Sequence, residues 1–376
     1  MENRIVFNIR RQSGIELLRI FAMFLIIISH SLPIYGSTDL PSFINLNNTP
    51  SSANQFFPIL FEHFGPLGNC IFIICSAWFL VDNDNIKGEK IRHILFDCFT
   101  ISFIFLCIYL FTDYNIEFDV IIKQLLPTSF GNNWFIGCYL LMYALHPLLN
   151  LIINNIGQRA HLVLLMVSLF IYCIIYFVLH TFKDFYSSLL FFCIIYFLVA
   201  YIKKYLKLIQ NNNKTVWIIL LSSTLIFVMS LIALCILGNN ITFLKDKMMY
   251  WDSIRNPFLL IVALSLFMIF KNMKFSSHYV NAISSLSLLI YVIHDNMLLK
   301  TFTKQDLWFW IYTNFSYDLL PIWIIIIAMI QAVASLILAT IYKFTIKQLV
   351  DKISEVLCRP LFYGTKILTD KILTLK

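Results

Sequence analysis

Three side chains on one apolar segment could perform acid–base chemistry. Arg19 and His30 are eleven residues apart, which at about 100° per residue is three helical turns, so both project from one face about 16 Å apart. Glu16 precedes Arg19 by one turn and can pair with it. A neutral imidazole is competent as a general base, and a guanidinium binds anions. The alternatives are an Arg19 that snorkels to the headgroups and a His30 that is merely hydrogen-bonded in the interior.

The composition places this face inside a membrane. Of 376 residues, 60% are hydrophobic and 13% charged, with a mean hydropathy of +0.80. An ordinary globular domain has roughly 25% charged residues, so a soluble fold is excluded. Ionisable residues within membrane-spanning helices are costly and are functional candidates by default.

The apolar runs predict an all-α, polytopic integral membrane helical bundle of about ten transmembrane helices. With the N-terminus in the cytoplasm, 21 of the 28 Lys and Arg fall on inner segments and seven on outer ones, and both termini are cytoplasmic. Segment 34–63 has no Lys or Arg and is expected to be an outer loop. The runs are 15–33, 64–81, 94–112, 134–153, 161–179, 186–202, 216–238, 256–270, 282–299 and 319–342.

Several familiar kinds of site are excluded. The net charge of +8 follows the membrane topology and does not indicate nucleic acid binding. The nine Cys contain no C-x-x-C and are interpreted as small hydrophobic residues. The histidines lack metal-ligand spacing, so no metal site is predicted. His93 and Asp97, spaced i, i+4, are expected to satisfy each other.

Four motifs, in order along the chain, resemble those of the acyltransferase 3 family of membrane O-acyltransferases. In the second of these, Ser76-Ala77 stands where the family usually has Ser-Gly. The motifs are Gly14-Ile15-Glu16-x-Leu18-Arg19 followed by His30; the run 67–80; Asn133-Trp134-Phe135-Ile136-x-x-Tyr139-Leu140-x-x-Tyr143; and the run 285–294, which contains Tyr291 and His294.

The resemblance implies an activity and a location. Family members transfer acyl groups, usually acetyl from acetyl-CoA, to hydroxyls of cell-surface glycans. The chain lacks the C-terminal SGNH domain of some members, which resembles the stand-alone members acting on capsular or exopolysaccharide precursors. We therefore expect a multi-pass protein of the bacterial cytoplasmic (inner) membrane, with a glycan or lipid-linked oligosaccharide as acceptor. The expected domains are an acyltransferase 3-type transmembrane domain, 1–344, and a basic amphipathic cytoplasmic tail, 345–376.

The resemblance also suggests roles for individual residues. His30 is the expected general base, an acyl-enzyme on His30 being the alternative, and Glu16 assists by orienting Arg19. Coenzyme A is anionic, so the expected donor-binding residues are basic ones near the inner face. The alternative for these basic residues is that they are ordinary positive charges on inner segments, which set the membrane topology. For His294 the alternative is a polar cap at the membrane interface. The donor candidates are Arg19, Lys90 and Arg92, and the acceptor candidates are Trp134, Tyr139, Tyr291 and His294.

Two other classes of protein share the general pattern of spans and inner charge. A polysaccharide transporter or flippase would show it, as would a glycan polymerase, although a polymerase is expected to carry a large Arg-bearing outer loop. The other membrane O-acyltransferase family does not predict the alignment of Arg19 with His30. The sequence makes no prediction of oligomeric state.

Overall fold

The computed structural model is helical throughout the part of the chain that it describes. That part comprises residues 12–33, 53–129, 133–176, 187–207, 210, 212–241, 244, 253–315 and 319–359. Within these ranges there is no β-strand, so the predicted all-α fold is confirmed. The helices are α1 (Ser13–His30), α2 (Ala53–Glu62), α3 (Phe64–Leu80), α4 (Gly88–Leu110), α5 (Phe118–Leu125), α6 (Trp134–Asn155), α7 (Gln158–Leu169), η2 (Phe170–Ile175), α9 (Ser188–Tyr205), α11 (Asn213–Asn240), α13 (Pro257–Lys271), α14 (His278–Ser284), α15 (Ser287–His294), η4 (Leu299–Thr303), α16 (Lys304–Asn314) and α17 (Leu320–Thr345).

Eight helical segments of the described chain are long and apolar enough to cross a membrane. The second of them, Phe56–Leu80, runs through both α2 and α3, and a further apolar helix, α13, is shorter. The chain is therefore a multi-pass membrane protein, as predicted. Part of the expected outer loop 34–63 is helical from Ala53 onward, because the stretch Phe56–Phe61 is apolar, and residues 34–52 lie outside the described part.

The predicted ninth helix, 282–299, is divided into short pieces. Helix α14 ends at Ser284 and α15 begins at Ser287, and the Ser285 hydroxyl donates to the Ala282 carbonyl over 2.6 Å. Serine side chains that bond nearby backbone groups compete with continuous helix, which explains the break. The shorter helix α15 that follows the break ends at His294.

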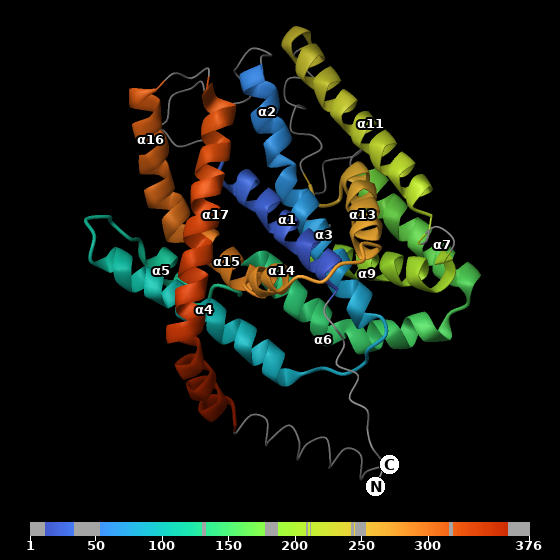
Figure 1. Ribbon diagram of the computed structural model, residues 1–376, viewed down its shortest axis with the longest axis horizontal. Coiled ribbons are helices and arrows are strands. Elements are labelled where there is room, and N and C mark those ends of the chain that lie inside the picture. Colours follow the sequence, from blue (N-terminus) through green and yellow to red (C-terminus); the bar gives the residue numbers. More distant parts are fainter. Residues whose placement is uncertain are drawn as a thin grey trace.

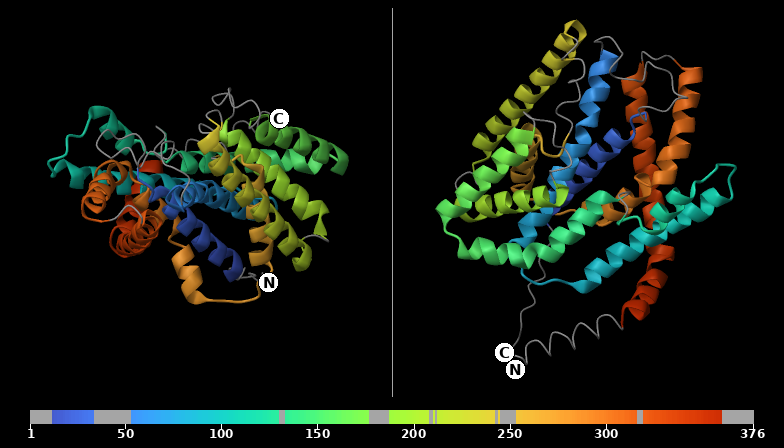
Figure 2. Two further views of the ribbon diagram at one scale, coloured as in Figure 1. Left: turned by 90° about the horizontal axis from the view of Figure 1, so that it is seen from above. Right: turned by 180° about the vertical axis from the view of Figure 1, so that it is seen from behind.

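Helices α1 and α3 lie at the centre of the molecule (Figure 1). Figures 1 and 2 show α16 and α17 on one side of them and α11 and α13 on the other. Helix α1 contacts α3, α13, α14, α15 and α17. This position explains why α1 is apolar around most of its circumference, since a helix surrounded by other helices has no solvent face.

Two glycines allow α1 to pack closely against its neighbours. A Cβ atom at Gly68 of α3 would lie 2.6 Å from the Ala22 carbonyl oxygen, and one at Gly14 would lie 2.1 Å from the Phe270 carbonyl oxygen. Both distances are too short for a real side chain. Small residues at such crossings are the usual means by which membrane helices bring their backbones together.

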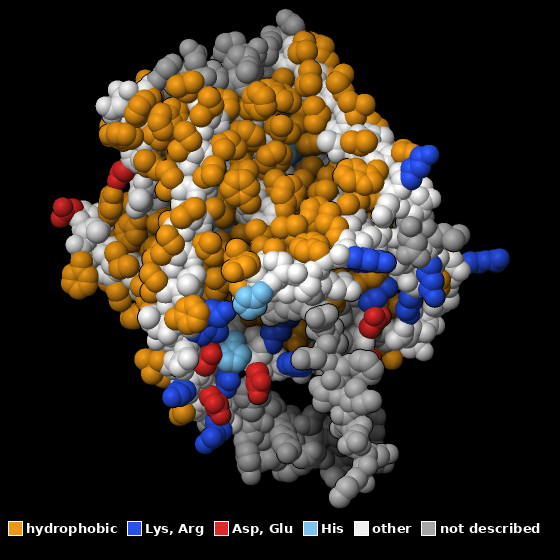
Figure 3. All heavy atoms as spheres, viewed as in Figure 1, with side chains coloured by type: hydrophobic (Ala, Val, Ile, Leu, Met, Phe, Trp, Pro, Cys, Tyr) orange, Lys and Arg blue, Asp and Glu red, His pale blue; other side chains and the backbone are white. Residues whose placement is uncertain are grey.

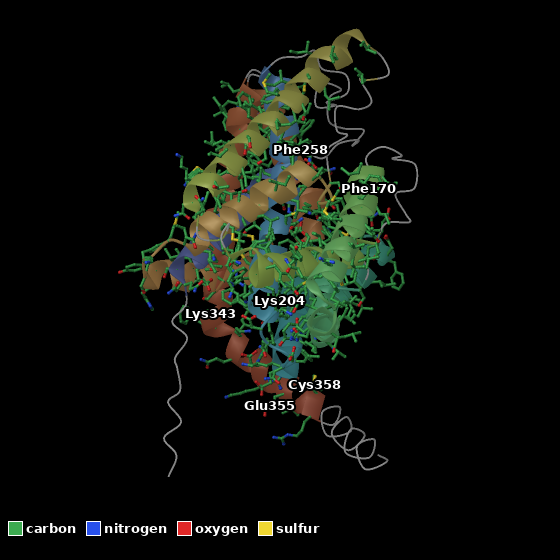
Figure 4. All side chains as sticks on the ribbon, turned by 90° about the vertical axis from the view of Figure 1, so that its right-hand side faces the viewer. Phe170, Lys204, Phe258, Lys343, Glu355 and Cys358 are labelled. Atoms are coloured by element: carbon green, nitrogen blue, oxygen red, sulfur yellow. The ribbon has the colours of Figure 1, made fainter. Side chains whose placement is uncertain are left out.

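Charged side chains gather at one end of the molecule. Figure 3 shows hydrophobic side chains over the upper part of one face, with most of the Lys, Arg, Asp and Glu of that face along its lower part. In Figure 4, Glu355 lies near the lower end and Lys343 above it, whereas Phe170 and Phe258 lie higher still. We keep the prediction that the charged end faces the cytoplasm.

Candidate active site

His30 meets a second histidine and a carboxylate at the end of α1. Its Nδ1 lies 3.0 Å from Oδ1 of Asp295 and 3.2 Å from Nε2 of His294. The two imidazole rings are stacked, with centroids 5.3 Å apart. His294 and Asp295 are buried, whereas the side chain of His30 is 25% exposed. His30 is therefore the member of the group that a substrate can reach.

The hydrogen bonds define which nitrogen of His30 is free. Nδ1 of His294 lies 2.8 Å from the Ile290 carbonyl oxygen, which can only accept, so this Nδ1 carries the proton. In the neutral ring Nε2 of His294 is then an acceptor, and both groups near Nδ1 of His30 accept hydrogen bonds. This pattern assigns the His30 proton to Nδ1 and leaves Nε2 with a lone pair. Such a ring is oriented as a base.

Two lysines and a tryptophan complete the end of α1. Lys300 pairs with Asp295, Lys304 Nζ donates to the His30 carbonyl over 2.6 Å, and Trp308 Nε1 donates to the Ser31 carbonyl over 3.1 Å. The last carbonyls of a helix have no partner within it, so these donors satisfy groups that would otherwise be unpaired. Burial, with the charge of Lys300 second, lowers the pKa of Lys304 to about 7.

A cavity of about 620 Å³ opens at the charged end of the molecule. Arg19 lines it, with NH1 3.6 Å from Oε2 of Glu16, and the Ser284 hydroxyl donates to that same oxygen over 2.5 Å. Within the described part of the chain, Nε of Arg19 is buried without a hydrogen-bond partner. The guanidinium is thus held by Glu16 and keeps donors for an anionic ligand. The basic residues of the lining are Arg19, Lys87, Lys90, His93 and Lys347, and the acidic ones are Glu16, Glu89, Asp97 and Asp351.

The structure places the predicted site residues in three groups: those that line the cavity, the histidine pair, and those that belong to neither. Glu16, Arg19, Lys90, Tyr139 and Tyr291 line the cavity, and the Lys90 ammonium donates to the Tyr139 hydroxyl over 2.5 Å.

His30 and His294 form the pair at the other end of α1. Arg92 and Trp134 are not among the described residues that line the cavity; Trp134, the first residue of α6, packs against Phe135 and Phe192.

Tyr291 connects the cavity to the histidine pair. Its side chain lines the cavity, and its ring meets the His294 ring edge-on with centroids 5.7 Å apart. Met23, also in the lining, lies on α1 between Arg19 and His30. The cavity therefore extends from the charged end toward the imidazoles along α1.

The expectation that His93 and Asp97 satisfy each other is wrong. Each pairs instead with the helix 347–359, which follows α17: His93 with Asp351, and Asp97 with Lys347. The two elements carry complementary charges at the same i, i+4 spacing, a signal that was present in the sequence. Asp295 was also missed as a partner of His30, although its place directly after His294 in an apolar run marked it as costly to bury.

The three groups around Nδ1 of His30 also have the spacing of metal ligands. His30, His294 and Asp295 each offer one ligand atom, and these atoms lie within 4.8 Å of one another. Lys300 already pairs with the Asp295 oxygen that faces His30, so a divalent cation would have to displace an ammonium ion. This charge arrangement favours proton chemistry, and the prediction that no metal binds here stays a prediction.

The chain belongs to the acyltransferase 3 family: the family's acyltransferase domain matches residues 12–341, nearly the whole chain. The protein is therefore a membrane acyltransferase, and the transporter, flippase and polymerase alternatives are set aside. No curated protein and no solved structure matches the chain. Both the cavity and the histidine pair lie mainly within the matched residues, whereas Lys347 and Asp351 lie beyond them.

Proposed function

We propose that the protein transfers an acetyl group from acetyl-CoA to a hydroxyl of a bacterial cell-surface glycan, a capsular polysaccharide or exopolysaccharide, at the cytoplasmic membrane. The observation that supports this most directly is the arrangement along α1. A cavity with Arg19 and three lysines in its wall, beside four carboxylates, lies at one end, and an oriented, partly exposed imidazole lies about three turns away at His30.

The cavity suits the donor. Coenzyme A carries several phosphate charges at one end and its thioester at the end of a long flexible arm. Arg19 offers a planar set of donors to a phosphate, and Lys90 offers a point charge at the cavity wall. In this proposal the phosphates bind at the charged end and the arm extends past Met23 and Tyr291 toward His30. Arg92 is outside the lining and has no part in the proposal.

The reaction uses Nε2 of His30 as the general base. The acceptor oxygen attacks the thioester carbonyl carbon while its proton moves to Nε2. A new C–O bond forms, the C–S bond breaks, and the coenzyme A thiolate leaves. The proton held at Nε2 then protonates that thiolate, so the imidazole returns to its starting state. General-base catalysis of this kind contributes about 10²–10⁴-fold to the rate.

Asp295 and His294 position the base. When Nε2 is protonated the ring of His30 carries a positive charge, and the buried carboxylate of Asp295, 3.0 Å from Nδ1, stabilises that charge. His294 accepts from the same N–H group. The acceptor role expected for His294 is thereby replaced, in our proposal, by orientation of His30.

The acceptor, a glycan or lipid-linked oligosaccharide, is proposed to approach His30 from the side opposite the donor. Tyr139 contacts Lys90 within the cavity, so we assign it to the donor side. Tyr291 reaches both the cavity and His294 and is assigned to the point where the two substrates meet. An acyl-enzyme on Nε2 of His30 is the alternative mechanism, because the same lone pair could attack the thioester.

The test is the O-acetyl content of polysaccharide from cells that express the protein. NMR spectra are recorded for wild type, for His30→Ala and for His278→Ala, which removes an exposed imidazole from the start of α14. We expect loss of O-acetyl signals only with His30→Ala. Acetylation near the wild-type level in that variant, with the protein present in the membrane, would contradict the proposed base.

A further inference from the structure

The helix that follows α17 contacts α4 at the edge of the cavity. Helix 347–359 carries Lys347 and Asp351, which both line the cavity, and lies outside the residues that match the family. Nδ1 of His93 is 2.6 Å from Oδ1 of Asp351, and Nζ of Lys347 is 2.7 Å from Oδ2 of Asp97. A segment expected to be a separate tail thus forms part of the wall of the cavity.

Asp97 holds Lys347 in place. Its carboxylate is only 5% exposed and accepts from the Tyr342 hydroxyl over 2.8 Å as well as from Lys347. A buried carboxylate with two donors is a fixed counter-ion, since removing its cationic partner would leave an uncompensated buried charge. Lys347 itself remains 27% exposed, so its ammonium keeps donors that can reach the cavity.

Asp351 has a different position. Its side chain is 32% exposed, it is 3.6 Å from Lys347, and its closest partner is the imidazole of His93. It therefore lies between the imidazole of His93 and the ammonium group of Lys347. The Asp351 carboxylate therefore occupies the positions beside His93 and Lys347 that the oxygen atoms of a phosphate would take.

We propose that helix 347–359 belongs to the donor-binding site: Lys347 binds a phosphate of the donor, and Asp351 competes with that phosphate for His93 and Lys347 and so limits donor affinity. This inference rests on the proposed donor, a phosphate-bearing thioester. It assigns to this chain a determinant of donor affinity outside the family's domain.

The experiment measures coenzyme A binding to the full-length protein in detergent, by calorimetry. Asp351→Asn is expected to bind about two- to fivefold more tightly, the range for removing one half-exposed charge. Glu355→Gln is the matched control, because it removes an exposed carboxylate one turn further along the same helix, labelled in Figure 4. It should leave affinity unchanged.

A second set of variants removes a positive charge, that of Lys347, and is expected to have the opposite effect on affinity. Lys347→Gln should weaken coenzyme A binding while Lys352→Gln, an exposed neighbour, should not. Because Lys347→Gln unpairs Asp97, Lys347→Arg is included: it keeps the charge and should retain most of the affinity. In transfer assays, Asp351→Asn should lower the KM for acetyl-CoA with kcat unchanged, and should not alter the KM for S-acetylpantetheine, which has no phosphate.

The outcomes separate this inference from the proposed function. If the wild type does not bind coenzyme A, the proposed donor is wrong and the inference fails with it. If the wild type binds but Asp351→Asn binds no more tightly, the inference alone is overturned. Equal tightening by Glu355→Gln would also overturn it, because the effect would then be general electrostatic attraction. Retained affinity in Lys347→Gln would remove Lys347 from the site.

Discussion

The orientation of one imidazole ring carries the proposed chemistry. Among its described contacts, Nδ1 of His30 has no backbone acceptor; two side chains at the end of α15, those of His294 and Asp295, accept its hydrogen bond instead. The other buried histidines of the described chain bond differently. His63 and His146 each place Nδ1 against a carbonyl of their own helical turn, and His161 places Nε2 against the carbonyl of Phe197. Among the histidines that the structure describes, only His30 is coupled to a buried carboxylate.

Replacement of Asp295 tests this coupling at the level of a single residue. Asp295→Asn should lower kcat about 100-fold, because the amide cannot stabilise the protonated ring, and leave the KM for acetyl-CoA unchanged. Asp295→Glu should restore part of the loss.

The matched control for this experiment is Asp306→Asn, which changes an exposed aspartate of α16. Steady-state kinetics on purified protein distinguish the outcomes. A rise in KM with no fall in kcat would assign Asp295 to donor binding and contradict its role as a positioning residue.

At the scale of elements, helix α1 has to be held accurately, because it carries both Arg19 and His30. Its close crossing of α3 depends on the absence of a side chain at Gly68. The crossing determines how closely α1 approaches α3, while Lys304 and Trp308 of α16 hold the end of α1 by hydrogen bonds to its last carbonyls. Packing and capping thus act on the same helix from different sides.

Gly68→Ala should therefore disturb the site from a distance. The added Cβ would lie 2.6 Å from the Ala22 carbonyl oxygen, so α1 must shift, at a cost of about 1–3 kcal/mol. We expect a lower Tm in detergent together with reduced transfer. Gly157→Ala is the control, because no atom lies within 4 Å of a Cβ at that position. Equal Tm values for the two variants would show that the crossing is not tight.

Lys304 should make stability depend on pH. Burial lowers its pKa to about 7, and the ordinary lysine value is 10.5, so between these values the unfolded chain binds a proton that the folded chain lacks. Stability from this residue is therefore present at high pH and is lost as pH falls toward 7. After burial, the charge of Lys300 lowers the pKa of Lys304 further, whereas the carboxylates of Glu62 and Asp295 raise it and so oppose the shift.

Lys304→Met removes the titrating group. The difference between the Tm of wild type and the Tm of this variant should increase from pH 7 to pH 9.5, measured by thermal unfolding in detergent. Lys123→Met, which changes a lysine of α5 whose side chain is 36% exposed and pairs with Asp119, should show no such trend. A difference that is constant across this pH range would mean that Lys304 titrates normally.

For the whole molecule, hydrophobic patterning predicted the fold class and most of the spans, because long apolar helices are determined locally. Periodicity on α1 also predicted which of its residues share a face. The sequence did not show that 282–299 is broken, because the bond from the Ser284 hydroxyl to the Glu16 carboxylate, beside that from Ser285 to the Ala282 carbonyl, forms only once α14 packs against α1. Nor did it pair α4 with helix 347–359, since contacts between residues some 250 positions apart depend on how all the helices pack.

We propose that the two substrates bind at opposite ends of α1. In the proposed reaction, anionic donor groups bind at the charged end, the acceptor reaches His30 at the other, and the acyl group passes between them. Each half can be inactivated separately, because Arg19 and His30 contact different sets of residues. A single assay on the complete protein can therefore test both.

The most direct measurement is transfer of radiolabelled acetyl from acetyl-CoA to polysaccharide by the purified protein in liposomes. We predict transfer by the wild type, loss of transfer without loss of coenzyme A binding in His30→Ala, and weaker coenzyme A binding in Arg19→Gln. Transfer by His30→Ala at the wild-type rate, or no label in the polysaccharide with any form of the protein, would contradict the account.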